Sequence, residues 1–253
     1  MLVAGAGGLG SHVLQSIARL GPLRLEVWDP GVLDEPDLNR QILYEESDLG
    51  RRKADVAAER LRAINTDLDV TVVLDTLNYQ TFRDYSSLRD RAPSDATSSP
   101  DARASMVIFD CLDSFVARAG IAPIADALSA PIFHGGVEGW CGQATTILPG
   151  TGGYAGRFGP EFASIPPAMK LILTQTVSTI AALQVAEYLH WCDDPGETPL
   201  SRRLMLYDGK SLRFDSIEIS IPTSAGHSGP EELPRQVVLN NLTRNEAGRR
   251  VSE

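Results

Sequence analysis

Cysteine is scarce in this chain of 253 residues, and the three that occur, Cys111, Cys141 and Cys192, lie far apart. No two of them form a CxxC pair, and an odd number does not complete a disulfide framework. Long apolar runs are also lacking, since none approaches the ~18 residues of a membrane span. The N-terminus has neither the basic segment nor the cleavage site of a secretory signal. We therefore expect a cytoplasmic protein that works away from membranes.

Basic residues are also few relative to acidic ones. The chain has 23 Lys and Arg residues against 33 Asp and Glu residues, which gives a formal net charge of −10. Nucleic-acid surfaces are built from clustered Lys and Arg, so this balance argues against a nucleic-acid partner. Any anion that the protein binds must be held by a few basic residues placed locally.

What the chain does have is a regular alternation of segments with strand-like and helical periods. Strands are expected at 2–4, 23–28, 70–74, 106–109, 131–135 and 143–148, helices at 11–20, 51–63, 116–128 and 168–189, and a closing hairpin at 204–207 and 211–219. This order predicts an α/β fold, with a Rossmann-like nucleotide-binding sheet flanked by helices and a C-terminal hairpin extension. The helix at 168–189 has a broad apolar surface, and we expect it to be buried or at an interface.

Three segments fall outside this alternation. Residues 86–105 are rich in Ser, Pro, Ala and charge, and residues 150–167 in Gly, Pro and small residues. Both compositions predict exposed loops, the second a long crossover or lid. We place one domain at 1–222 and expect the polar tail, 223–253, to be partly disordered or to dock on a partner.

A glycine-rich turn follows the first strand. Gly5-Ala6-Gly7-Gly8-Leu9-Gly10 fits GxGxxG between a strand and a helix, where glycines let the backbone approach a phosphate at the helix N-terminus. Asp29 ends the second strand about 20 residues further on, a position that suits hydrogen bonds to ribose hydroxyls. By themselves these residues fit an NAD- or FAD-binding fold as well as an ATP site, or a tight structural turn.

Basic and polar residues near this motif favour a triphosphate over a dinucleotide. Asp37-Leu38-Asn39-Arg40-Gln41 is followed by Arg51-Arg52-Lys53, which brings several donors toward one nucleotide. Arg and Lys stabilise the charge that develops during adenylyl transfer. The alternative is that the second group only begins a solvated helix, although positive charge there opposes the helix dipole.

Two carboxylates follow the strand at 106–109. Asp110-Cys111-Leu112-Asp113 falls at its carboxyl end, the edge where open parallel sheets bind ligands. Mg²⁺ is normally held by one or two carboxylates together with phosphate oxygens, so Asp113 is the candidate metal ligand and Asp110 supports the turn. Alternatively, Asp113 only caps the next helix.

The residues that carry a family resemblance keep one order and spacing: Gly5 to Ser11, Asp29, Leu38-Asn39-Arg40-Gln41, Gly50 with Lys53, and Asp110-Cys111-Leu112-Asp113-Ser114. Together they resemble the ubiquitin-activating-enzyme-like adenylyltransferases ThiF, MoeB and HesA, and the resemblance spans roughly residues 1–220. It implies an ATP- and Mg²⁺-dependent enzyme that adenylylates the C-terminal Gly-Gly carboxylate of a ubiquitin-like sulfur-carrier protein, in thiamine, molybdopterin or related sulfur transfer. It also implies a homodimer.

The resemblance assigns roles to particular residues. Arg40, Lys53 and Asp113 become the catalytic candidates: the two cations would bind the phosphate chain and Asp113 the Mg²⁺ ion. The other nucleotide contacts would come from Gly5, Gly7, Gly8, Gly10, Asp29, Asn39, Gln41 and Ser114. Among these, Gly8 would approach the phosphates and Asp29 the ribose. No general base is expected, because the attacking carboxylate is already ionised.

The chain departs from the family in several places. It begins without the helix that in relatives lends an arginine to the partner subunit's ATP site. Gly153-Tyr154-Ala155-Gly156 stands where many relatives have a zinc-binding CxxC pair, so no zinc is expected. Residues 150–167 lack the cysteine that some relatives use to accept the activated carboxylate. Asp37 and Ser114 replace asparagines that are common in the family, which predicts a different nucleotide affinity or preference.

Two other functions fit parts of this pattern. A degenerate family member would bind a nucleotide or a partner without catalysis, in keeping with the absent first helix and zinc pair. An NAD-dependent oxidoreductase shares the glycine motif, but Arg40 and Lys53 have no role there and no acid or base for hydride transfer stands out. None of the three cysteines is expected to be a nucleophile, and His134 is expected to be a structural histidine.

Overall fold

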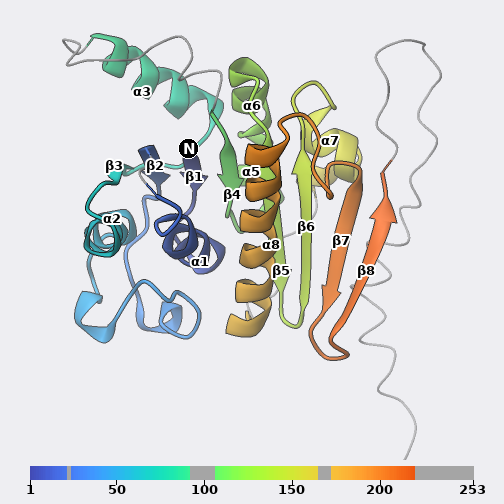
Figure 1. Ribbon diagram of the computed structural model, residues 1–253. Helices are drawn as coiled ribbons and strands as arrows, with labels where there is room; N and C mark the ends of the chain where they lie inside the picture. Colours follow the sequence, from blue (N-terminus) through green and yellow to red (C-terminus); the bar gives the residue numbers. More distant parts are fainter. Residues whose placement is uncertain (22–23, 92–105, 165–171, 220–253) are drawn as a thin grey trace, which may run out of the picture. The chain divides into compact units, whose positions relative to one another are not determined.

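The fold is built on one sheet, seen in a computed structural model that describes residues 1–21, 24–91, 106–164 and 172–219 (Figure 1). Its eight strands run in the order β3-β2-β1-β4-β5-β6-β7-β8. They are β1 (Leu2–Ala4), β2 (Arg24–Trp28), β3 (Asp69–Val73), β4 (Ile108–Asp110), β5 (Ile132–Glu138), β6 (Cys141–Ile147), β7 (Arg203–Asp208) and β8 (Arg213–Glu218). The strands from β3 to β5 in this order pair in parallel, and the last three strands are added antiparallel. The α/β class, the Rossmann-like sheet and the closing hairpin are confirmed.

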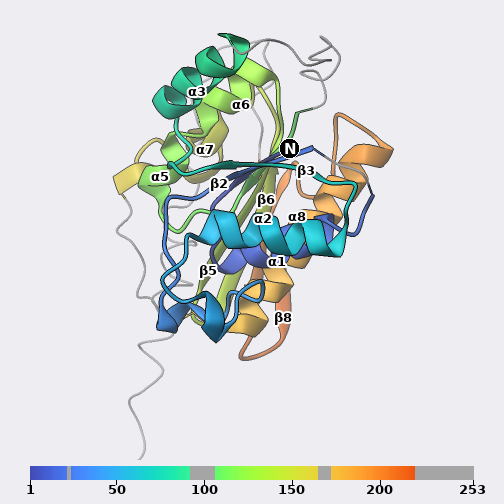
Figure 2. The ribbon, with the colours of Figure 1, turned by 90° about the vertical axis from the view of Figure 1, so that its left-hand side faces the viewer.

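Helices cover both faces of this sheet (Figure 2). They are α1 (Gly8–Ile17), α2 (Lys53–Ile64), α3 (Tyr79–Arg91), α5 (Phe115–Ala119), α6 (Ala122–Leu128), α7 (Gly153–Phe158) and α8 (Thr174–Asp193), with 3-10 turns η1 (Glu35–Asp37), η2 (Glu46–Asp48) and η3 (Phe162–Ser164). α1, α2 and α8 lie on one face, and α3, α5, α6 and α7 on the other. Because the central strands are covered on both sides, both of their faces are apolar: Val3 packs in the first layer and Leu2 in the second. Within the described residues, no helix combines the length and apolar character needed to cross a membrane.

The helix expected at 116–128 is divided into α5 and α6. Gly120 follows the first helix, and Pro123 stands in the first turn of the second, where it has no N–H to continue a single hydrogen-bond ladder. A Cβ atom on Gly120 would lie 2.9 Å from the Cβ atom of Asn78. The break between the helices therefore also allows a close approach to the turn that precedes α3.

The first expected loop, at 86–105, begins as a helix. α3 continues to residue 91, since Phe82 and Tyr85 pack against Trp28 and hold the helix on the sheet. Tertiary packing thus outweighs the polar composition of its end. Residues 92–105 lie outside the described residues.

The second expected loop, at 150–167, is also partly helical. It contains α7 and η3, and Tyr154 and Arg157 of α7 are buried. The expectation of an exposed crossover is therefore wrong for 153–158. Residues 165–171, including the start of the helix expected at 168–189, lie outside the described residues, as does the tail at 223–253. The described residues 172 and 173 are extended, so the helix begins at Thr174 as α8 and continues to Asp193, and its buried face includes Val177 and Ile180.

One buried carboxylate joins the elements around the end of β4. Asp110 accepts hydrogen bonds at Oδ2 from Arg118 Nε at 3.0 Å, His134 Nδ1 at 2.6 Å and the Tyr154 hydroxyl at 2.6 Å. These partners come from α5, β5 and α7. Oδ1 accepts from the backbone N–H of Leu112 at 3.1 Å, so Asp110 supports the turn after β4 as expected.

The charges in this network compensate one another. Burial raises the pKa of Asp110, but Arg118, His134 and Tyr154 together outweigh burial and hold that pKa below its ordinary value. Burial lowers the pKa of His134, and its neutral ring donates from Nδ1 to Asp110 and accepts at Nε2 from Gln143. The expected structural role of His134 is confirmed.

Replacing Arg118 by Met should lower the free energy of unfolding by about 3–5 kcal/mol, because Asp110 would stay buried without its cationic partner. The matched control is Arg203→Met, which breaks an exposed ion pair with Glu218 and should cost no more than ~1 kcal/mol. Urea unfolding followed by circular dichroism measures both. Equal losses in the two variants would contradict the importance assigned to the network.

Candidate functional site

The carboxyl ends of β1, β2 and β4 meet at one edge of the sheet. Ala4, Trp28 and Asp110 are partners in register across these three strands, so the segments that follow them are neighbours. The chain proceeds from β1 to β2 on one side and returns to β4 on the other, which makes this edge a topological switch point. Open α/β sheets bind their ligands at such points.

Two of the motif glycines are required by packing. Gly5 has φ of +92°, and a Cβ atom there would lie 2.8 Å from the carbonyl oxygen of Cys111. A Cβ atom on Gly10 would lie 1.9 Å from the carbonyl oxygen of Gly5. Only glycine allows α1 to begin this close to β1 and β4. Burial and the charge of Asp110 raise the pKa of Cys111 well above its ordinary value, so this thiol is a poor nucleophile.

Gly7 and Gly8, in contrast, leave room for a Cβ atom. A Cβ atom on either residue would come no closer than 3.7 Å to another group, which is Gln41 at Gly7 and Val177 at Gly8. Gly7 is the N-cap of α1, and no side chain caps the helix there. Among the described residues no side-chain acceptor is bound to the first amides of α1, and such amides form a binding site for an anion.

Asp29 and Tyr44 support the turn from the side. Asp29 accepts hydrogen bonds from Ala6 N at 2.7 Å and Gly31 N at 2.6 Å, and each carboxylate oxygen keeps a further lone pair for a ribose hydroxyl. The Tyr44 hydroxyl donates to the Ala6 carbonyl at 2.6 Å, and burial raises its pKa, so it remains a donor. No motif marks Tyr44 in the sequence, because its contact joins residues 38 positions apart.

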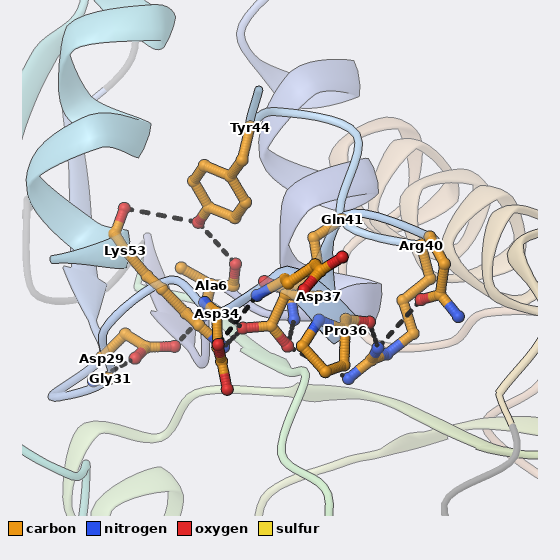
Figure 3. Close-up of polar contacts among 12 residues, drawn as sticks. Ala6, Asp29, Gly31, Asp34, Pro36, Asp37, Arg40, Gln41, Tyr44 and Lys53 are labelled. Carbon is orange, nitrogen blue, oxygen red and sulfur yellow. Dashed lines mark hydrogen bonds and ion pairs between the residues drawn. The ribbon is translucent and has the colours of Figure 1, made fainter. Parts of the chain in front are cut away.

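Arg40 and Lys53 converge on one carboxylate beside the glycine turn (Figure 3). Arg40 Nη2 lies 3.2 Å from Asp37 Oδ1, and Lys53 Nζ lies 2.9 Å from Asp37 Oδ2. Gln41 Nε2 donates to Oδ1 of Asp37 at 2.6 Å, and Asn39 Oδ1 accepts from Arg40 Nη1 at 2.9 Å. The structure thus brings four predicted site residues together around a fifth residue, Asp37.

Arg51 and Arg52 do not join this cluster. Arg51 forms ion pairs with Asp48 at 3.0 Å and Glu59 at 2.6 Å, and Arg52 is exposed, with no ion pair to any residue in the described ranges. Of the three consecutive basic residues, Lys53 is the one that faces Asp37. Neither expectation for the three residues as one group therefore holds: Arg51 and Arg52 precede α2 and do not pair with Asp37, and Lys53, the first residue of the helix, is held at Asp37.

The loop after β4 separates the roles of two predicted site residues. Ser114 caps α5, since its hydroxyl accepts from Ala117 N at 3.3 Å. Asp113 is exposed and has no hydrogen bond or ion pair to a described residue, so it does not act as the cap. No group of three or more potential metal ligands occurs in the parts of the chain that the structure describes. A site with one protein carboxylate, completed by phosphate oxygens, fits Asp113 and Mg²⁺.

Comparison with known proteins gives several sequence matches. A model of the ThiF family matches residues 1–226. The chain is 28% identical to the SAMP-activating enzyme E1 of Haloferax volcanii, over 86% of this chain and 75% of that protein. It is 26% identical to the sulfur carrier protein ThiS adenylyltransferase of Escherichia coli, over 87% and 81% of the two chains. It is 30% identical to the adenylyltransferase and sulfurtransferase MOCS3 of Arabidopsis thaliana, but spans only 44% of that protein.

Solved structures show the same fold. Escherichia coli MccB with ATP matches with a TM-score of 0.68 at 18% identity, over 90% of this chain and 66% of MccB. PaaA matches with a TM-score of 0.66 at 16% identity, over 87% of this chain and 72% of PaaA. At these identities the likeness concerns the fold alone, and this chain spans about two thirds of MccB.

Substitution by alanine should distinguish the motif glycines required for packing from those that leave the α1 amides accessible. Gly10→Ala should cost about 2–3 kcal/mol of stability, because its Cβ atom would overlap the Gly5 carbonyl oxygen. Gly8→Ala should change stability by less than ~1 kcal/mol, since its Cβ atom has room, but should weaken binding at the α1 amides. Thermal unfolding and calorimetric titration with ATP measure the two effects. A Gly10→Ala protein as stable as Gly8→Ala would contradict this division.

Proposed function

The chain belongs to the ThiF family of adenylyltransferases and activating enzymes, and we propose that it uses ATP to adenylylate the C-terminal Gly-Gly carboxylate of a ubiquitin-like sulfur-carrier protein. The observation that carries the proposal is the pairing of Arg40 and Lys53 around one anion beside an open helix N-terminus. Such a pair suits the phosphate chain of ATP and has no task in hydride transfer.

The proposed reaction makes one bond and breaks one. A carboxylate oxygen of the carrier attacks the α-phosphorus of ATP, and pyrophosphate leaves with the electrons of the broken P–O bond. Since the nucleophile is already ionised, the protein needs only to position two anions and stabilise the charge that develops. Arg40, Lys53 and the first amides of α1 supply the positive groups, and Asp29 supplies an acceptor for the ribose.

Asp113 is the side chain that would hold Mg²⁺, which when bound offsets phosphate charge. Its exposure, its place at the ligand-binding edge and its lack of a partner among the described residues support this role. The relatives named for the SAMP-activating and ThiS reactions support a small carrier protein as the second substrate.

Exchange between ATP and labelled pyrophosphate tests the proposal. Purified protein with a candidate Gly-Gly carrier and Mg²⁺ should catalyse exchange that depends on the carrier. Asp113→Ala should reduce this exchange by about 100-fold, because the site loses its metal-binding carboxylate. Chelating Mg²⁺ should abolish it.

The matched control is Asp67→Ala. Asp67 is also an exposed aspartate, but it precedes β3 and so lies at the opposite edge of the sheet. Its substitution should leave the exchange rate unchanged. If ATP binds but no carrier supports exchange, the chain is instead a nucleotide-binding family member without catalysis.

A further inference from the structure

The carboxylate of Asp37 is fully engaged by the groups that surround it (Figure 3). Oδ1 accepts from Gln41 Nε2 and Arg40 Nη2, and Oδ2 contacts Lys53 Nζ at 2.9 Å and accepts from the backbone N–H of Asp34 at 3.2 Å. Its side chain is only 12% exposed. One carboxylate therefore forms ion pairs with both Arg40 and Lys53, the cations proposed to bind phosphate.

The position of Asp37 leaves it little freedom to move away. It ends η1 and takes part in a capping box, in which Asp34 binds the start of the turn and Asp37 binds back to Asp34. Arg40 and Lys53 are themselves mostly buried, with side-chain exposures of 19% and 15%. Two cations held this close would repel each other without the anion between them. Asp37 thus stabilises the pair when no phosphate is bound.

The same arrangement affects what the site can bind. With Asp29 on the other side of the glycine turn, the two carboxylates balance the charges of Arg40 and Lys53. An incoming triphosphate would share both cations with a fixed negative charge. The repulsion is smaller when a divalent cation has already neutralised part of the phosphate charge.

We infer that Asp37 is a built-in counter-ion that makes this site select the metal complex of ATP over free ATP. The inference rests on the proposed function for its ligand, but it concerns binding and not turnover. According to this inference, Asp37 controls whether the site binds the metal complex of the nucleotide or the free nucleotide. Asp37 is a specificity-determining residue in this scheme, and Arg40 and Lys53 remain the groups that contact phosphate.

Calorimetric titration of the full chain with ATP tests the inference, in Mg²⁺ and in EDTA. Wild-type protein should bind ATP at least about tenfold more weakly in EDTA, the effect expected when one fixed charge faces an unshielded phosphate chain. Asp37→Asn should bind metal-free ATP about tenfold more tightly than wild type, because one negative charge is removed at nearly constant shape. Its affinity in Mg²⁺ should change much less.

Asp34→Asn is the matched control. It removes the same charge three positions away on an exposed residue, and asparagine keeps the oxygen that caps η1. Its preference for Mg²⁺ should equal that of wild type. Melting temperatures of all three proteins show whether each variant is folded.

Two results would overturn the inference. In the first, Asp37→Asn keeps the full wild-type dependence on Mg²⁺. In the second, it binds ATP more weakly in both buffers, which means that Asp37 only positions the cations. If the variant does not fold, equal affinity of wild-type protein for ATP in Mg²⁺ and in EDTA would overturn it as well. Pyrophosphate exchange reports separately on the proposed function. If the ATP affinities change as expected between Mg²⁺ and EDTA but no exchange occurs, catalysis is refuted and the role of Asp37 remains.

Discussion

The buried carboxylate of Asp110 is the constraint on which the rest of this structure depends. Its side chain binds groups from α5, β5 and α7, and its backbone carbonyl accepts from Gln184 of α8 at 2.8 Å. Helices from both faces of the sheet are therefore joined at the end of one strand. Because the carbonyl of the next residue, Cys111, packs against Gly5, the glycine turn takes its place from the same point. The segments that meet at the candidate ligand-binding edge are therefore joined through one buried, compensated charge.

Burial separates the tasks of the carboxylates at this edge. Asp110 is completely enclosed and every bond it makes is internal, so it serves the fold. Asp113, three residues later, is exposed and has no partner among the described residues, which is what a metal ligand completed by phosphate requires. Asp37 lies between these extremes, since it is nearly buried yet bound to Arg40 and Lys53, the two cations proposed to bind phosphate. Desolvation and neighbouring groups thus separate the same carboxylate into three roles: support of the fold at Asp110, and the proposed metal binding at Asp113 and nucleotide selection at Asp37.

The glycine motif also contains two kinds of residue. Gly5 and Gly10 are required because backbone atoms occupy the space of a side chain, whereas Gly7 and Gly8 keep the approach to the α1 amides open. A motif of this kind is ambiguous in a sequence, since the packing glycines are common to every nucleotide-binding fold of this class. The neighbouring Arg40 and Lys53 separate the ATP interpretation from the dinucleotide one.

The sequence by itself determined the order of the strands, the helices α1, α2 and α8, the glycine turn and the residues placed at the carboxyl ends of the strands, because periodicity and turn chemistry are local. Only the tertiary structure decided which of three consecutive basic residues faces Asp37. The helix α2 begins at Lys53, Arg52 is extended before it, and Arg51 pairs with Asp48 and Glu59. The tertiary structure also decided that α3 and α7 form where the composition favours loops, because burial of their aromatic residues outweighs local preference. The Tyr44 contact and the engagement of both cations by Asp37 likewise depend on distances that no local pattern contains.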